Sequence, residues 1–337
     1  MEKKPRTLIQ KARKGMDMAE KDSFALKEVD RVEILTLMDN YVDVLLRSTD
    51  IVTRPPQAKG MVIPADTLVA EHGLSLLVKV WRGGEAHELL FDTGYSSIGL
   101  PHNLRLLEVD LKDIEAVVLS HGHMDHTGCL YPVLESLGRA VPVVVHPEAF
   151  LSPRYFGLDD GRKLLFPQII SREGIRDRGG EVVESERPVL LAGDSILVTG
   201  EVDRVTPFEK GLPNAVLERD GREEKDIIRD DQALVIRLKG DRLVVISGCA
   251  HAGIVNTVIQ ARKLTGLESI HTVLGGFHLS GPVFEPIIEE TIKSFKEMDP
   301  QVLSPMHCTG WKAIQRFAEE FPHAFELNSV GSKFSLS

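Results

Sequence analysis

Residues 120–128 read SHGHMDHTG and follow directly on the apolar run DIEAVVL at 113–119. Within six positions they bring together three imidazoles and one carboxylate, from His121, His123, Asp125 and His126. Such groups solvate one another poorly, so crowding them is costly unless a positive charge holds them. A bound metal ion is the simplest source of that charge.

The spacing of this motif suits two ions rather than one. In locally extended backbone the side chains at positions i and i+2 point the same way, so His121 and His123 can hold one ion from one side. Asp125 and His126 turn away after the bend and can hold a second ion. Mixed imidazole and carboxylate ligands suit Zn2+, with Mn2+ and Fe2+ as the other candidates.

The same local order recurs three more times: an apolar run, a polar cluster with a histidine, and a stretch of helical periodicity. Alternating strands and helices predict a layered α/β protein with its helices outside. Ligands of such proteins bind at the carboxyl ends of the strands. Six histidines spread over about 190 positions are therefore expected to meet there, namely His121, His123, His126, His251, His278 and His307. Of the later ones, His251 and His307 are the best candidates to complete the two ligand sets.

Upstream of this region the sequence predicts three strands. VEILTLMDN at 32–40 reads as one strand, and LSLLVKVWRGGEAHELLFDTG at 74–94 reads as two strands joined at Arg82-Gly83-Gly84. A Gly-Gly pair between apolar runs indicates a hairpin, because glycine accepts the positive φ that a tight turn needs.

The composition of the whole chain limits its partners. The 337 residues carry a net charge of -10, which argues against a nucleic acid as the main partner. No stretch approaches the roughly 18 apolar residues of a membrane span, and the N-terminus lacks the apolar region of a secretory signal, so we expect a cytoplasmic protein. Cys129, Cys249 and Cys308 form no CxxC pair, which favours neither a disulfide framework nor a structural thiolate zinc site. Nothing in the composition indicates an oligomeric state.

Residues 1–30 are polar and mixed in charge, and we expect a surface helix or an arm there. Residues 31–337 are expected to form the functional domain. Two charged segments rich in Gly, Pro, Asp and Arg, at about 151–181 and 203–231, fit the strand and helix plan less well. They are expected to be long surface loops that act as lids, with a disordered insertion as the alternative.

The motif H-x-H-x-D-H after a strand, preceded by LLFDTG at 89–94, resembles the metallo-β-lactamase superfamily. The resemblance extends from about residue 33 to 310. It implies a four-layer αββα sandwich with a one- or two-metal site at one edge of its sheets. More narrowly, EHGLSLLV, SGCAHAGIVN, GGFHL and HCTG resemble the branch that contains dihydropterin ribofuranosylaminobenzene phosphate synthases.

The chain departs from the superfamily pattern at two positions. Many members carry a Gly-Asp whose carboxylate bridges both ions, but here the sequence is Gly248-Cys249-Ala250-His251. Glu201 stands where many members have a histidine. The departure implies that His251 supplies the missing contact to the first ion and that the second ion lacks its bridging carboxylate. Whether Cys249 or Glu201 contacts a metal is left open.

These observations predict a metal-dependent hydrolase. A metal-bound hydroxide would attack a small-molecule phosphoester, phosphodiester or cyclic phosphate, pterin-like substrates included. Asp125 would orient the nucleophile and Asp92 would fix the tautomer of a ligand imidazole. His278 would be a ligand or a hydrogen-bond donor to substrate, and His72 and Asn40 are candidates to line the pocket.

Other functions stay open at this point. A lactone or thioester hydrolase of the same fold, a diiron-type redox protein, and a binding protein without chemistry are the alternatives. The redox proteins resemble H-x-E-x-D at the first motif, where this chain has His123, and the intact motif argues against a purely binding role. The remaining histidines lack supporting context and are expected to be structural, namely His87, His102, His146, His271 and His323.

Overall fold

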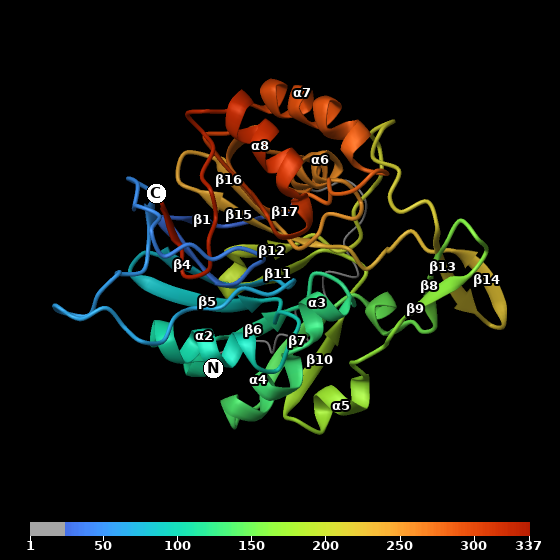
Figure 1. Cartoon of the computed structure of the whole chain (residues 1–337), viewed down its shortest axis with the longest axis horizontal. Coiled ribbons are helices and arrows are strands. Elements are labelled where there is room, and N and C mark those ends of the chain that lie inside the picture. The colour runs from blue at the N-terminus through green and yellow to red at the C-terminus, as the bar shows by residue number, and fades with distance from the viewer. Residues whose placement is uncertain (1–23) are drawn as a thin grey trace, which may run out of the picture.

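Short runs rich in Val, Ile and Leu form the strands of two large sheets that lie face to face (Figure 1). The computed structural model describes residues 24–337. Helices cover the outer side of each sheet, so the molecule has four layers in the order α, β, β, α. The predicted αββα sandwich is confirmed.

The first sheet contains the three parallel strands that lead to the later histidines. Its order is β11-β12-β15-β16-β17-β18, and β1 pairs with β15. The neighbours β16, β17 and β18 run parallel, and helices connect them in turn. The bounds are β1 Glu28–Val29, β11 Val189–Leu191, β12 Ile196–Val198, β15 Ala233–Leu238, β16 Arg242–Ser247, β17 Ser269–Gly276 and β18 Val302–Met306.

The second sheet carries the strand that leads to the first motif. Its order is β10-β7-β6-β5-β4-β2-β19-β3, with β5, β6, β7 and β10 parallel. The bounds are β2 Arg31–Met38, β3 Val52–Thr53, β4 Ser75–Arg82, β5 Glu85–Phe91, β6 Ala116–Val118, β7 Val141–Val145, β10 Gly180–Glu184 and β19 Lys333–Leu336.

The core lies in three apolar layers, because successive side chains of a strand point to opposite faces. In β15, Leu234 and Ile236 face the second sheet, whereas Val235 faces the helices. Helices α6, α7 and α8 cover the first sheet, and α2, α4 and α5 cover the second. The helix bounds are α2 Gly99–Leu107, α3 Met124–Thr127, α4 Leu130–Leu137, α5 Arg172–Arg176, α6 Ile254–Thr265, α7 Ile288–Met298 and α8 Trp311–Glu320.

The predicted hairpin is confirmed. Strands β4 and β5 pair antiparallel with Arg82 opposite Glu85. Gly83 and Gly84 have φ of 58° and 85°, which a tight two-residue turn requires at both central positions.

The two segments expected to be loops form strands instead. Strands β8 Arg154–Gly157, β9 Lys163–Phe166, β13 Ala215–Arg219 and β14 Arg222–Lys225 make a third sheet in the order β14-β13-β8-β9. Figure 1 shows this sheet beside the two large sheets, on the side of α3. All four residues of β14, REEK, are exposed, so no apolar alternation marked this strand in the sequence.

The expected boundary at residue 30 is also corrected in part. The expected arm falls largely on residues 1–23, which lie outside the described residues. Residues 24–30 belong to the sandwich. Leu26 is buried in the apolar layer between the first sheet and its covering helices, and β1 pairs with β15 of that sheet. No helix within 24–337 is both long enough and apolar enough to span a membrane.

Candidate metal centre

The predicted histidines lie at the carboxyl ends of four strands from both sheets. Strand β6 leads into the first motif, and β16, β17 and β18 lead to His251, His278 and His307. Because these strands are parallel to their neighbours, their ends share one edge of the sandwich, and the polar residues that follow them meet there. Two groups of candidate ligands result.

The first group consists of His121, His123 and His251. One ring nitrogen of each lies within 4.8 Å of the others. The Nε2 atoms of His121 and His251 are 3.2 Å apart. The ring centroid of His123 lies 4.6 Å from that of His121 and 4.9 Å from that of His251.

The second group consists of Asp125, His126, His307 and Cys249. Asp125 Oδ2 lies 3.3 Å from His307 Nε2 and 3.5 Å from His126 Nε2. The Nε2 atom of His126 is 3.1 Å from His307 Nε2 and 3.2 Å from Cys249 Sγ. This group thus offers imidazole, carboxylate and thiol donors around one point.

A buried carboxylate sets the tautomers of two of these imidazoles. Asp92 accepts a hydrogen bond from the Ser120 amide at Oδ1, and from the Ser120 hydroxyl and His126 Nδ1 at Oδ2, all at 2.7 Å. The Ser120 oxygen in turn faces His121 Nδ1 at 2.9 Å. With Nδ1–H donated in both rings, the network assigns a free lone pair to Nε2 of His121 and of His126.

Asn40 sets the tautomer of the His307 imidazole. Its Oδ1 accepts from His307 Nδ1 at 3.0 Å, and its amide nitrogen donates to the His307 carbonyl at 3.0 Å. The same amide nitrogen lies 3.1 Å from His72 Nδ1. His72 stands at the rim, with its Nε2 3.7 Å from Asp125 Oδ2.

Burial keeps the first group neutral. Burial and the neighbouring imidazoles hold the pKa of His121 and His251 well below the usual range. Burial likewise lowers the pKa of His123 to about 4, despite the opposing charge of Asp125. Neutral imidazoles are the form that binds a metal ion.

The carboxylates in and beside the second group require a balancing positive charge. Burial disfavours the charged form of His126, but the carboxylates of Asp125 and Asp92 outweigh it and raise the pKa of this ring well above its usual value. Burial also disfavours ionised Asp125, yet His126 and His307 keep its pKa low. Either a proton or a bound cation must supply the balancing charge.

His278 borders both groups without completing either. Its ring centroid is 4.2 Å from that of His251, and one of its nitrogens lies within 4.8 Å of ligand atoms of Cys249 and His251. Its ring is partly buried, and the buried Nδ1 atom has no hydrogen-bond partner among the described residues. The ring also forms a hydrogen bond with the Cys308 thiol, and it stands beside the first group without being one of its members.

The sequence left open whether Cys249 or Glu201 contacts a metal, and the structure places only Cys249 among the candidate ligands. Cys249 Sγ lies in the second group, as described above, and also near His251 and His278. Glu201 accepts from Arg229 Nη1 at 2.9 Å and belongs to none of the candidate groups formed by residues 24–337.

Several residues that hold the motif were missed by the sequence analysis. Asp230, paired with buried Arg154 at 2.7 Å, accepts from the Gly122 amide at 2.8 Å and so fixes the turn between His121 and His123. A Cβ at Gly122 would lie 2.4 Å from the Ala149 carbonyl oxygen, which explains the glycine.

Asp231 holds the other side of the centre. Its Oδ2 accepts from the Ala252 amide at 2.8 Å, next to His251. The adjacent carboxylates of RDDQ at 229–232 were a signal, but they fell in a segment that was expected to be a loop.

The histidines expected to be structural lie in none of the candidate groups of the described chain. His87 pairs with Glu115, His102 contacts the Thr67 carbonyl, and His271 contacts the Thr272 hydroxyl.

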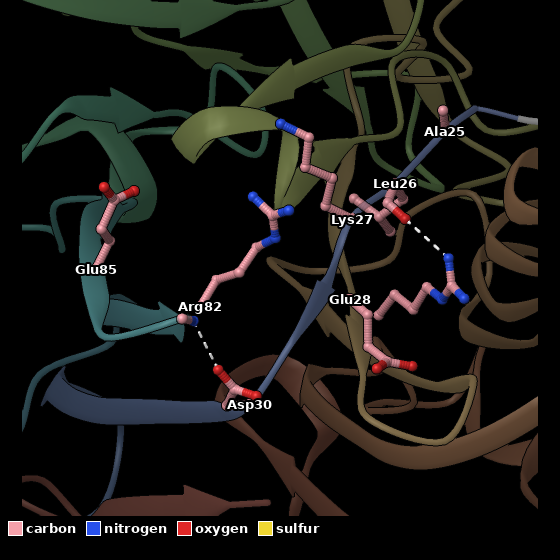
Figure 2. Close-up of a pocket in the computed structure, with 9 residues that line it drawn as sticks. Ala25, Leu26, Lys27, Glu28, Asp30, Arg82 and Glu85 are labelled. Carbon is pink, nitrogen blue, oxygen red and sulfur yellow. Dashed lines mark hydrogen bonds between the residues drawn. The ribbon is translucent and has the colours of Figure 1, made fainter.

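A pocket of about 820 Å³ also lies apart from the centre (Figure 2). Charged residues in and beside β1, at the β4–β5 turn and in β15 line it, and none of its lining residues belongs to a candidate group.

Comparison with known proteins identifies the family. Residues 69–207 match the family described as the metallo-beta-lactamase superfamily. A 7,8-dihydropterin-6-methyl-4-(beta-D-ribofuranosyl)-aminobenzene-5'-phosphate synthase of Methanocaldococcus jannaschii is 34% identical over 272 residues, which are 78% of this chain and 89% of that protein. The chain belongs to the metallo-beta-lactamase superfamily.

Other superfamily members are similar over different lengths. A crystal structure of a metal-dependent hydrolase of the beta-lactamase superfamily is 28% identical with a TM-score of 0.66, and the match covers 91% of this chain and 98% of that one. The N-acyl homoserine lactonase AiiB of Rhizobium rhizogenes is 39% identical over only 67 residues, 20% of this chain and 23% of that protein. The protein is thus an enzyme of the metal-dependent hydrolase class of this superfamily, whose members bind divalent metal ions.

Proposed function

We propose that this metallo-beta-lactamase superfamily protein hydrolyses a small-molecule phosphoester, phosphodiester or cyclic phosphate at a centre of two Zn2+ ions. The observation that carries the metal part is the contact between His126 and His307. Their Nε2 atoms face each other at 3.1 Å, while the Nδ1 atoms of both rings are engaged with Asp92 and Asn40. Two lone pairs at that distance repel each other unless a proton on His126 or a metal cation lies between them, and the nearby carboxylate and Cys249 thiol supply the further donors that a metal ion needs.

The donor atoms support a divalent transition-metal ion in each group. His121, His123 and His251 would hold the first ion, and Asp125, His126 and His307 the second. Cys249 would be a further donor to the second ion, because its Sγ is as close to His126 Nε2 as the other candidate ligands are. Imidazole, carboxylate and thiol donors together favour Zn2+, with Mn2+ and Fe2+ as alternatives.

Ions bound here would lower the pKa of water and stabilise negative charge on oxygen. The chain's own residues hold the geometry and meet the substrate. Asp92, Ser120 and Asn40 keep the ligand nitrogens pointed inward through the hydrogen bonds described above. Asp125 Oδ2, close to both His126 and His307, can also orient a nucleophile, and the partly buried ring of His278 beside His251 is a candidate to contact the substrate.

A phosphorylated substrate with a pterin-like group is the finer part of the proposal. It is supported by the relative from Methanocaldococcus jannaschii, whose name contains both a dihydropterin and a 5'-phosphate. The short match to a lactonase makes lactones the main rival substrate class.

The proposal is tested on protein stripped of metal and reloaded with Zn2+, Mn2+ or Fe2+. Bis(p-nitrophenyl) phosphate, a cyclic nucleotide, a lactone and a thioester would be compared as substrates. We expect phosphodiester turnover that falls at least about 100-fold in His123→Ala, since losing a residue that merely orients a ligand already costs about 10- to 100-fold. His323→Ala, an exposed histidine far along the chain, is the matched control.

Two results would contradict the proposal in different ways. Turnover of the lactone or thioester alone would leave the hydrolase and refute the phosphoester. A folded His123→Ala protein with parental turnover of the phosphodiester would refute the role of the centre.

A further inference from the structure

Five aromatic rings form an unbroken row along one side of the candidate metal centre. Consecutive ring centroids from Phe166 through His123, His251 and His278 to Phe284 are 5.0, 4.9, 4.2 and 4.6 Å apart. The three histidines belong to the centre or border it, whereas the two terminal rings are apolar. Phe166 comes from β9 of the third sheet, and Phe284 from the connection between β17 and α7.

Neither phenylalanine is a core residue. Both are only partly buried, and neither belongs to the three apolar clusters of the described chain. Each has an exposed apolar neighbour, with Leu164 56% exposed and Val283 46% exposed. Apolar side chains left open beside a few convergent polar groups are typical of a ligand pocket.

We propose that Phe166 and Phe284 determine specificity by stacking with a planar aromatic part of the substrate. The inference rests on the proposed function, because an anionic group at the metal centre would place the remainder of the substrate beside this row. Aromatic rings attract one another in offset or edge-to-face arrangements, and the row offers both the face and the edge of a ring. An aliphatic group of the same charge would gain less from these contacts.

The arrangement of Phe166 also suggests that this residue only supports the His123 imidazole. The experiment must distinguish such support from recognition of the substrate. Its ring lies parallel to His123 at an interplanar angle of 9° and can hold that imidazole in place. Loss of support would lower the affinity of the centre equally for every small molecule that binds there. Loss of recognition would weaken only aromatic ligands.

The test compares phenylphosphonate with methylphosphonate, which carry the same anionic group and are not hydrolysed. Their dissociation constants are measured by calorimetry on the Zn2+-loaded protein, with metal content determined for each variant. We expect the wild type to prefer phenylphosphonate, and Phe166→Ala or Phe284→Ala to reduce this preference about two- to tenfold. Phe166→Leu should reduce it as well, because it keeps bulk near His123 and removes the aromatic face.

Leu165→Ala is the matched control. Leu165 is the neighbour of Phe166 in β9, is 58% exposed and points to the opposite face of the strand. We expect it to leave the preference unchanged.

Equal binding of the two phosphonates by wild type would overturn the inference, and so would an unchanged preference in both alanine variants. An equal loss of both ligands, together with lost metal, would assign Phe166 to support of His123 and also overturn it. Because these ligands are not turned over, the result stands apart from the hydrolysis assay, whose failure would refute the proposed function alone.

Discussion

Replacing Asp92 by Asn should weaken metal binding without changing the shape of the site. The side chain is fully buried and nearly isosteric with its replacement. Its Oδ1 can still accept from the Ser120 amide, but the new NH2 group would then face Nδ1–H of His126, where the carboxylate oxygen now lies at 2.7 Å. Two donors cannot share that contact, so His126 is driven to carry its proton on Nε2, the atom that faces the second group.

The size of the effect follows from the position of Asp92 behind the candidate ligands. Losing a partner that fixes a ligand imidazole costs about 10- to 100-fold in metal affinity. This corresponds to about 1.4 to 2.8 kcal/mol of binding free energy. Because Ser120 links Asp92 to His121 as well, the first ion should also be affected.

Competition with a chelator, followed by elemental analysis, measures both affinities. Ser75→Ala is the matched control, since the Ser75 hydroxyl donates to the backbone carbonyl of Asp92 at 2.9 Å and leaves the carboxylate untouched. Affinities of Asp92→Asn within about threefold of wild type would refute the reasoning, as would an equal loss in both variants, given the 10-fold minimum expected.

Three further changes test other parts of the structure. Burial raises the pKa of Glu209 from 4.5 to about 7, so the folded state holds a proton that the unfolded state has lost. The metal-free protein should therefore lose up to about 3 kcal/mol of unfolding free energy as the pH rises from about 4.5 to about 7, and urea denaturation should show a flatter profile for Glu209→Gln. Burial raises the pKa of the Cys249 thiol, so it should ionise only on a bound cation, and Co2+-loaded wild type should show a thiolate absorption band that Cys249→Ser lacks. Arg154→Met leaves the buried carboxylates of Asp226 and Asp230 unpaired and should cost about 3 to 5 kcal/mol of stability in the same denaturation assay.

The residues that meet at the centre could be proposed from the sequence because their order is local. HxHxDH spans six positions, and each later histidine directly follows an apolar strand. The rule that parallel strands present their carboxyl ends at one edge then supplied the long-range step. The alternation of strands and helices predicted a layered α/β protein with its helices outside, and the resemblance to the superfamily supplied the four layers.

The partners of those residues were harder to find. Asn40 and His307 are 267 positions apart, and Asp230 and Arg154 are 76 positions apart. No periodicity connects such pairs, because they form only after the sheets are packed. The third sheet was missed for a related reason: β13 pairs with β8, some 60 residues earlier, and β14 has no buried face.

The centre draws its side chains from the ends of strands in both large sheets, so it exists only when the two sheets have docked. An ion that binds this state and not the unfolded chain stabilises the fold, by about 4 kcal/mol when its free concentration is 1,000 times the dissociation constant. A shift of that size can change how much of a protein survives degradation in a cell. Scarcity of the ion would then lower the amount of the enzyme as well as its activity, and its half-life would report on metal supply.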